Sequence, residues 1–130
     1  MSAAQRLPGL MVLLINLPRS TDRRARMEQR LAALGLDYEL LPAVDGRAQW
    51  EQLLPSVDLP AFQRHAGGDV LPGEIGCYHS HLQAWQRLVA SDAQELLVLE
   101  DDMVFHDDFM QALRMALRGR EHWDMLKLAK

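Results

Sequence analysis

The chain has 130 residues, of which 48% are hydrophobic and 25% charged, and its formal net charge is −4 at pH 7. These values predict one globular domain over residues 1–130. The negative charge argues against a nucleic-acid-binding protein, which needs a basic face. No apolar run reaches about 18 residues, so no transmembrane helix is expected. The single cysteine, Cys77, excludes an intramolecular disulfide and suits a reducing compartment.

The first half of the chain predicts a strand, a helix and a second strand. Residues 11–15 form an apolar run that is typical of a buried strand. Residues 22–34 carry apolar side chains at helical spacing, and Gly35 stands where a C-terminal cap would lie. Residues 38–44 predict the second strand, which the pair Asp45-Gly46 closes. This order predicts a βαβ unit with a right-handed crossover.

Residues 47–71 lack strong periodicity and contain two prolines and the pair Gly67-Gly68. They predict one or two short helical turns in a long, partly mobile connection. Such a segment is either a lid or binding loop, or a poorly ordered surface insertion.

The second half predicts a helix over residues 72–90, a strand from residue 95, a helix capped by Asp107 or Asp108, and a last strand over 123–128. The first of these helices carries one apolar stripe, formed by Ile75, Tyr78, Leu82, Trp85 and Val89, and an adjoining stripe, formed by Cys77, His81, Ala84 and Leu88. The whole pattern predicts an α/β domain with a mainly parallel sheet.

The most informative feature is the apolar run 95–99, which ends in Glu100, Asp101 and Asp102. Ligands of open α/β sheets bind just beyond the carboxyl ends of such strands. Three adjacent carboxylates repel one another, so solvent, basic side chains or a divalent cation must stabilise them. From the residues alone, an acidic solvated loop and a cation site that contacts a substrate phosphate remain equally open.

Polar residues also follow the first two predicted strands. Asn16, Arg19, Arg23 and Arg24 come after the first, where guanidinium groups and a helix N-terminus suit a diphosphate. The alternative is that two or more of these arginines are solvated charges on a helix. Asp45 ends the second strand at the same edge, either as a contact to a base or ribose or as a turn-forming residue.

The helix over 72–90 carries a cysteine and two histidines. His79 and His81 point to different sides, so they do not form a helical metal pair. Cys77 and His81 share a face, but this pair without further ligands is a weak zinc signal. The simpler interpretation is that Cys77 packs and His81 hydrogen-bonds a neighbouring strand.

Four blocks of the sequence, taken in order, resemble glycosyltransferase family 25. The blocks are Ile15-Asn16-Leu17 with Arg19, Arg23 and Arg24; Pro42-Ala43-Val44-Asp45-Gly46; Pro72-Gly73-Glu74-Ile75-Gly76-Cys77 with Ser80, His81 and Trp85; and Leu99-Glu100-Asp101-Asp102. Each block is weak alone, whereas their order and spacing are specific. The family includes bacterial lipooligosaccharide galactosyltransferases and relatives of the collagen galactosyltransferases.

The resemblance implies a GT-A-like (Rossmann-like) fold and transfer of a sugar, galactose above others, from a UDP-sugar to a saccharide or lipooligosaccharide acceptor in lipopolysaccharide biosynthesis. It implies an enzyme in the cytoplasm or at the inner face of the membrane. Residues 100–102 would be its DxD-like element, with Mn²⁺ or Mg²⁺ on Asp102 and Glu100. The donor site would comprise Asn16, Arg19, Arg23, Asp45, Ser80, His81, Glu100 and Asp101.

Other classes fit less well. Receiver-type signalling domains and DxD phosphatases carry their acids after the first strand, where this chain has Ile15-Asn16-Leu17. Members of the resembled family usually continue past the strand at 123–128, so the chain is expected to be a fragment or a short relative. No residue is a convincing catalytic base, so this chain is expected to transfer sugar weakly or not at all, and robust transfer would point to a base among Asp58, Asp69 and Glu74. The alternative is a truncated, non-catalytic nucleotide-binding or interaction module.

The last predicted strand also bears on association. Its edge and its apolar residues would stay uncovered, and uncovered edges and apolar patches pair with other chains. A homo-oligomer is therefore expected, held partly through the apolar residues Trp123, Met125, Leu126 and Leu128.

Overall fold

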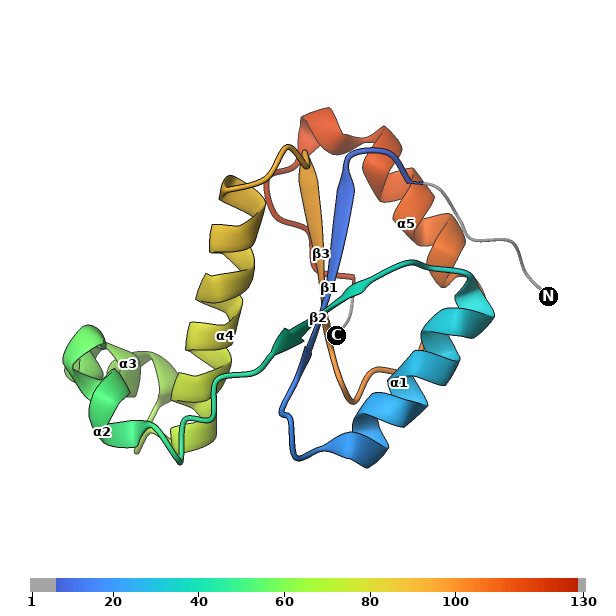
Figure 1. Cartoon of the computed structure of the whole chain (residues 1–130). Coiled ribbons are helices and arrows are strands. Elements are labelled where there is room, and N and C mark those ends of the chain that lie inside the picture. Colours follow the sequence, from blue (N-terminus) through green and yellow to red (C-terminus); the bar gives the residue numbers. More distant parts are fainter. Residues whose placement is uncertain (1–6, 129–130) are drawn as a thin grey trace.

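The computed structural model describes residues 7–128, apart from the side chain of Ala66. Strand β1 (Leu10–Asn16) lies in the middle of the sheet, as Figure 1 shows. It pairs in parallel with β2 (Glu39–Pro42) and with β3 (Glu95–Glu100), which gives the order β2-β1-β3. All three strands therefore end at one edge of the sheet. The predicted α/β class and parallel pairing are confirmed, and this small sheet is consistent with a Rossmann-like fold.

Helices cover both faces of the sheet (Figure 1). Helices α1 (Thr21–Leu34) and α5 (Phe109–Arg118) lie on one side, and α4 (Pro72–Val89) lies on the other. Side chains of β1 alternate between the two sides because successive residues of a strand point in opposite directions. The α1/α5 side has a core of Val12, Leu14, Met27, Leu31, Leu36, Leu99, Leu113 and Leu117, and the α4 side has one of Leu13, Ile15, Leu41 and Ala84.

The face that α4 buries differs from the predicted one. Its buried residues are Ile75, Gly76, Ser80 and Ala84, whereas Tyr78, Trp85 and Val89 are exposed. Small residues on the buried face let the helix axis approach the sheet and the loop after β2. Of the expected stripe, Ile75 is buried and Leu82 half-buried, whereas its other three members are exposed; in the adjoining stripe only Ala84 is fully buried.

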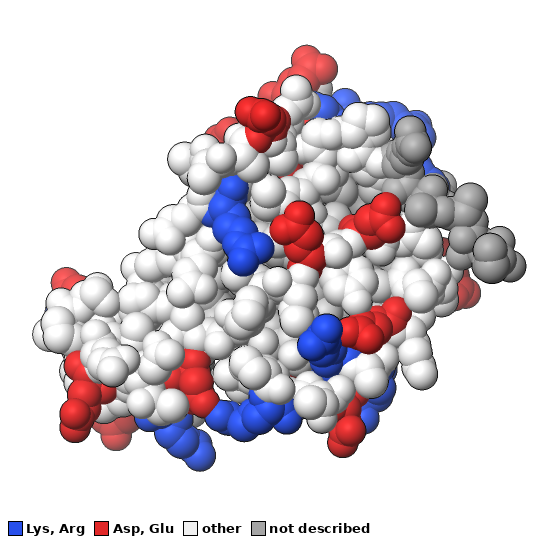
Figure 2. Space-filling view, viewed as in Figure 1, with Lys and Arg blue, Asp and Glu red and all other residues white. Residues whose placement is uncertain are grey.

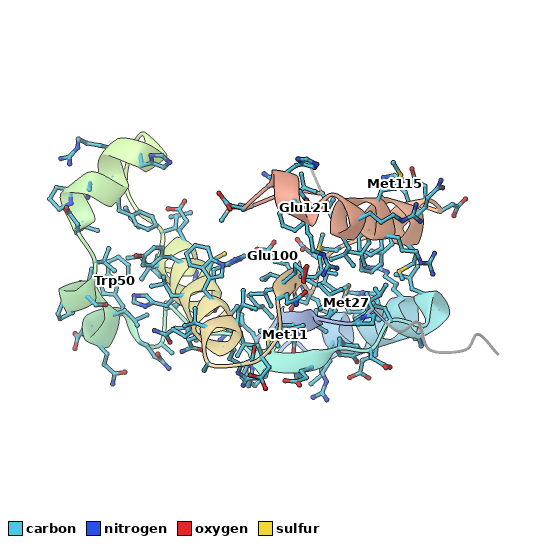
Figure 3. All side chains as sticks on the ribbon, turned by 90° about the horizontal axis from the view of Figure 1, so that it is seen from above. Met11, Met27, Trp50, Glu100, Met115 and Glu121 are labelled. Atoms are coloured by element: carbon cyan, nitrogen blue, oxygen red, sulfur yellow. The ribbon has the colours of Figure 1, made fainter. Side chains whose placement is uncertain are left out.

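The segment over residues 47–71 is more helical than predicted. It contains α2 (Trp50–Leu53), the 3-10 turn η1 (Leu54–Ser56) and α3 (Leu59–Ala66). The carboxylate of Asp58 accepts from Ala61 N–H at 3.1 Å and so caps α3. Figures 1 and 3 show this segment beyond α4, away from the sheet. It contacts α4 through Phe62, whose ring packs edge to face on that of Tyr78 with 6.0 Å between the ring centroids.

The strand predicted over residues 123–128 does not form. The short turn η2 (Arg120–His122) follows α5, and the indole N–H of Trp123 donates to the carbonyl of Ala116 at 2.9 Å. This bond holds the indole of Trp123 against α5, and residues 124–128 stay outside the sheet. The expected association through a free edge on this strand therefore loses its basis, although Met125, Leu126 and Leu128 are exposed. Within residues 7–128, every helix is too short or too polar to cross a bilayer.

Candidate functional site

A pocket of about 370 Å³ lies at the edge where the three strands end. Residues from the β1–α1 connection, the loop after β2, the first turns of α4 and the end of β3 line it. Of the predicted site residues, it brings together Arg19, Arg23, Asp45, Ser80, Glu100, Asp101 and Asp102. Asn16 and His81 do not line the pocket and instead hold groups that do.

The carboxylates after β3 have different surroundings. β3 ends at Glu100, whose carboxylate faces α4, with Oε1 3.4 Å from His81 Nε2 and 3.6 Å from Cys77 Sγ. Asp101 and Asp102 lie in the turn that follows. The neighbouring helix α1 reaches that turn, because Arg30 donates to the carbonyl of Met103 at 2.6 Å. Glu100 thus faces α4, whereas Asp101 faces Asn16 and Arg23. Opposite directions are expected for two successive residues at the end of a strand.

Asp101 is stabilised by polar partners from the β1 side. Asn16, only 2% exposed, donates from Nδ2 to Asp101 Oδ2 at 2.8 Å and to the carbonyl of Ser20 at 3.1 Å. Arg23 stands 3.5 Å from the other oxygen of Asp101. Repulsion between Asp101 and its neighbouring carboxylates is therefore offset by a basic side chain, as one of the predicted alternatives had it, together with an amide.

Asp45 organises the loop after β2. Its Oδ1 accepts the backbone N–H groups of Arg47 at 3.2 Å and Ala48 at 3.1 Å, and its Oδ2 forms an ion pair with Arg19. The bond from Ala48, followed by that from Arg19, lowers the pKa of Asp45 from its ordinary value. The turn-forming role of Asp45 is therefore present, and it also places Arg19 at the pocket.

Ser80 and two glycines fasten this loop to α4. The hydroxyl of Ser80, 1% exposed, accepts from Val44 N–H and donates to the carbonyl of Gly76, both at 2.8 Å. A Cβ on Gly46 would overlap the carbonyl of Pro72, and a Cβ on Gly76 would come within 2.5 Å of Val44 O. The glycines therefore permit a close crossing of backbones, and Ser80 positions the pocket wall.

The carboxylate oxygens of the β3 turn suit a hard divalent cation. Asp102 lines the pocket and is exposed, and among the described residues no side-chain partner occupies it. Mg²⁺ in particular is commonly held by one or two carboxylates together with substrate phosphates. The residues present therefore fit an Mn²⁺ or Mg²⁺ ion anchored at Asp102, because Asp101 is already engaged by Asn16 and Arg23.

The sequence did not predict three residues that line the pocket or contact the segment after β3. Arg30 gives no signal because its partner is a backbone carbonyl 73 residues away. Arg47 lines the pocket. Its position directly after Asp45 and Gly46, at the end of a predicted strand, could have identified it as a site residue. Cys77 also lines the pocket, and burial together with the charge of Glu100 raises the pKa of its thiol.

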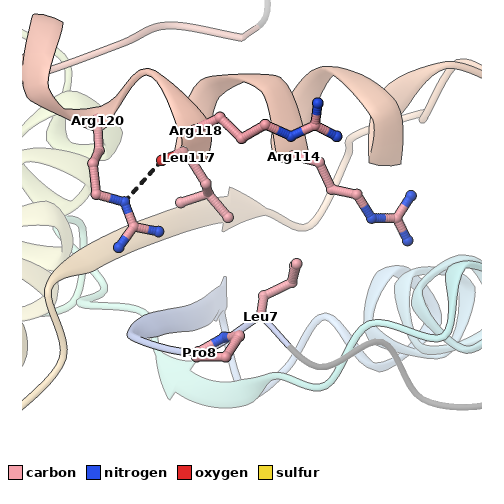
Figure 4. Close-up of a pocket in the computed structure, with 6 residues that line it drawn as sticks. All are labelled: Leu7, Pro8, Arg114, Leu117, Arg118 and Arg120. Atoms are coloured by element: carbon pink, nitrogen blue, oxygen red, sulfur yellow. Dashed lines mark hydrogen bonds between the residues drawn. The ribbon is translucent and has the colours of Figure 1, made fainter.

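The rest of the surface offers less chemistry. Charges of both signs are interspersed on the face seen in Figure 2, among wide uncharged areas. A second pocket, of about 390 Å³, lies between the start of the described chain and α5 (Figure 4). Its lining is apolar except for arginines, one of which, Arg120, pairs with the buried Glu95 at 2.8 Å. It holds no carboxylate, cysteine or histidine among its lining residues.

Comparison with known proteins identifies the family of this chain. Residues 10–130 match the family model described as glycosyltransferase family 25 (LPS biosynthesis protein). A glycosyltransferase 25 family member from Aedes aegypti is 34% identical over 88% of this chain and 20% of its own length. The inactive glycosyltransferase 25 family member 3 of Mus musculus is 33% identical over 92% of this chain and 22% of its own.

Procollagen galactosyltransferase 2 of Homo sapiens is 28% identical over 92% of this chain and 20% of its own length. The chain spans about a fifth of the length of these curated relatives. The family model covers nearly the whole chain, including every residue of the pocket. The chain therefore belongs to glycosyltransferase family 25.

Proposed function

We propose that this chain is the donor-binding part of a metal-assisted glycosyltransferase. It would move galactose from a UDP-sugar to a saccharide or lipooligosaccharide acceptor. The observation that carries this proposal is the pocket at the carboxyl edge of the sheet, where Arg19 and Arg23 accompany Glu100, Asp101 and Asp102. Such an edge is where open α/β sheets bind their ligands. Galactose is suggested by the name of the human relative, and the lipopolysaccharide acceptor by the description of the family model.

The residues of the pocket divide the work of binding a nucleotide diphosphate. The guanidinium groups of Arg19 and Arg23 donate to diphosphate oxygens, a pairing that suits their planar forks. Asn16 keeps Asp101 in place, and Asp101 keeps Arg23 directed at the pocket. Asp102, with Glu100 as a second oxygen ligand, would hold Mn²⁺ or Mg²⁺. When bound, such an ion neutralises charge that develops on the departing diphosphate.

Titration calorimetry of UDP with the full chain tests the metal assignment. UDP should bind more tightly with Mn²⁺ than without it, and Asp102→Asn should remove that increment. Asp107→Asn is the matched control, because Asp107 is an exposed carboxylate outside the pocket and should leave the increment intact. Equal UDP affinity with and without Mn²⁺ would refute the assignment.

The arginines are tested by comparing UDP with uridine. Arg23→Ala should weaken UDP by about 1.5–3 kcal/mol, the value of a hydrogen bond to a charged group, and uridine far less. Arg26→Ala is the control, since Arg26 is exposed on the same helix and does not line the pocket. The same loss for both ligands would mean that Arg23 does not contact phosphate.

A second candidate function is a nucleotide-binding module without transferase activity. Two of the three carboxylates to which robust transfer would point serve as helix caps: Asp58 accepts from Ala61 N–H, and Glu74 accepts from Leu71 N–H at 3.4 Å. Neither they nor Asp69 line the pocket. A transfer assay with UDP-galactose and a saccharide acceptor distinguishes the two. UDP binding without transfer by this chain would favour the binding module.

A further inference from the structure

We propose that Cys77, His81 and Glu100 form a binding site for a borderline-soft transition-metal ion such as Zn²⁺. The ligand chemistry of this site differs from that of the Mn²⁺ or Mg²⁺ site proposed at Asp102. Within residues 7–128, it is the one group of three metal-ligating side chains whose ligand atoms all lie within 4.8 Å of one another.

Two helical residues and one strand residue build the site. Cys77 and His81 are one turn apart on α4, so both side chains lie on the same face of the helix. Glu100 comes from the end of β3, and its Oε1 is 3.6 Å from Cys77 Sγ and 3.4 Å from His81 Nε2. Ligand atoms about 2.0–2.3 Å from a tetrahedral Zn²⁺ stand roughly 3.5 Å apart. Both separations from Glu100 are close to this value, and the ligand atoms of Cys77 and His81 lie within 4.8 Å of each other.

The chemistry of the three ligands selects the class of metal. One sulfur, one imidazole nitrogen and one carboxylate oxygen match the ligands that Zn²⁺ and Co²⁺ take in proteins. Mg²⁺ and Mn²⁺ prefer carboxylate, carbonyl and water oxygens, which Asp102 supplies, and Glu100 is the carboxylate that the two proposed sites share. Cys77 and His81 are thus the ligands that distinguish this site from the one at Asp102.

The site has a route to solvent and an open coordination position. Cys77 and Glu100 both line the pocket, so an ion between them and His81 would face it. Three protein ligands with a free fourth position are typical of zinc sites that also bind water or substrate, whereas structural zinc sites are closed by four protein ligands. We therefore expect Cys77, His81 and Glu100 to hold an ion that can exchange with solvent.

Spectroscopic titration of the untagged full chain with Co²⁺ tests the proposal. Cys77 is the only cysteine of the chain, so a thiolate-to-Co²⁺ charge-transfer band can arise only from that residue. The band should appear on titration and vanish when Zn²⁺ displaces the Co²⁺. A chain that gives no such band would overturn the proposal without any substitution.

Two histidines on α4 supply a matched pair of variants. His81→Gln should weaken Co²⁺ binding by at least about tenfold, because even the loss of partners outside the ligand shell costs 10–100-fold in affinity. His79→Gln should not, since His79 contacts Ser56 at 3.3 Å rather than the cluster. Glu100→Gln gives a second ligand variant if His81→Gln folds poorly. Unchanged affinity in both ligand variants would overturn the site.

This experiment uses no nucleotide, so the site and the proposed function can fail independently. Asp102→Asn should abolish the Mn²⁺-dependent gain in UDP affinity and leave the Co²⁺ band intact. Loss of the band in Asp102→Asn, with the fold unchanged by circular dichroism, would mean that the two metal sites are one and would contradict the proposal.

Discussion

Among residues 7–128, eight buried apolar residues form one core on the side of the sheet covered by α1 and α5, whereas four form the cluster on the α4 side. The α4 side instead carries polar groups that contact one another or the neighbouring backbone: Ser80 contacts Val44 N–H, and Glu100 contacts Cys77 and His81. It also leaves Tyr78, Trp85 and Val89 exposed. We infer that the α1/α5 side supplies most of the stability, while the α4 side shapes the pocket.

Truncating one leucine on each side gives the largest expected difference. Leu31→Ala removes a fully buried side chain on α1 and should lower the free energy of unfolding by about 2–5 kcal/mol. Leu88→Ala on α4 should cost well under half of that, because Leu88 is half-buried. Urea denaturation measures both. Equal losses would show that the two sides contribute equally to stability.

The crossing of α4 with the loop after β2 gives the next effect. Gly76→Ala should destabilise the chain by about 1–3 kcal/mol, because the added methyl group meets the carbonyl of Val44. Gly73→Ala, in the first turn of the same helix, has open space and should be neutral or stabilising by up to about 1 kcal/mol. Thermal unfolding compares the pair. If Gly73→Ala also destabilised the chain, the loss at Gly76 could not be attributed to the contact with Val44.

A smaller effect concerns Asp45 and pH. Because its folded-state pKa is lowered, its ionised form contributes stability above the ordinary pKa of an aspartate, about 3.8. That contribution is lost as the pH falls through the lower, folded value. The wild-type chain should therefore unfold at a higher temperature than Asp45→Asn at neutral pH, and the gap should close at acidic pH.

Arg19→Ala separates the causes of this shift. It should reduce the pH dependence without abolishing it, because the backbone N–H groups of Ala48 and Arg47 also lower the pKa of Asp45. A gap between wild type and Asp45→Asn that stays constant down to acidic pH would contradict the role of the carboxylate charge.

The smallest effect is expected on the exposed surface of α4. Val89 is 84% exposed, so Val89→Thr should change the free energy of unfolding by less than about 0.5 kcal/mol. The same substitution at Val12, which is 6% exposed on the α1/α5 side, buries a hydroxyl group and should cost about 1–3 kcal/mol. Chemical denaturation of both variants checks the contrast, and a large loss at Val89 would reveal a packing role there.

Local pattern was enough to predict β1, β3, α1 and the acidic end of β3. Each depends on neighbours a few residues apart: the apolar run before Glu100, the spacing of Met27 and Leu31, and a glycine at position 35 whose φ of 67° ends α1. Parallel pairing follows from the βαβ order, and it brings the strand ends to one edge. The place of the pocket was therefore predictable from the sequence.

Tertiary structure decided which residues meet in that pocket. Asn16 and Asp101 are 85 positions apart, and His81 and Glu100 are 19 apart, so no local pattern pairs them. The buried face of α4 was mispredicted because close approach to the β2 loop favoured Gly76 and Ser80 over large apolar residues. The strand predicted at 123–128 was likewise overridden, because a β-strand needs a paired neighbour and Trp123 bonds to α5 instead.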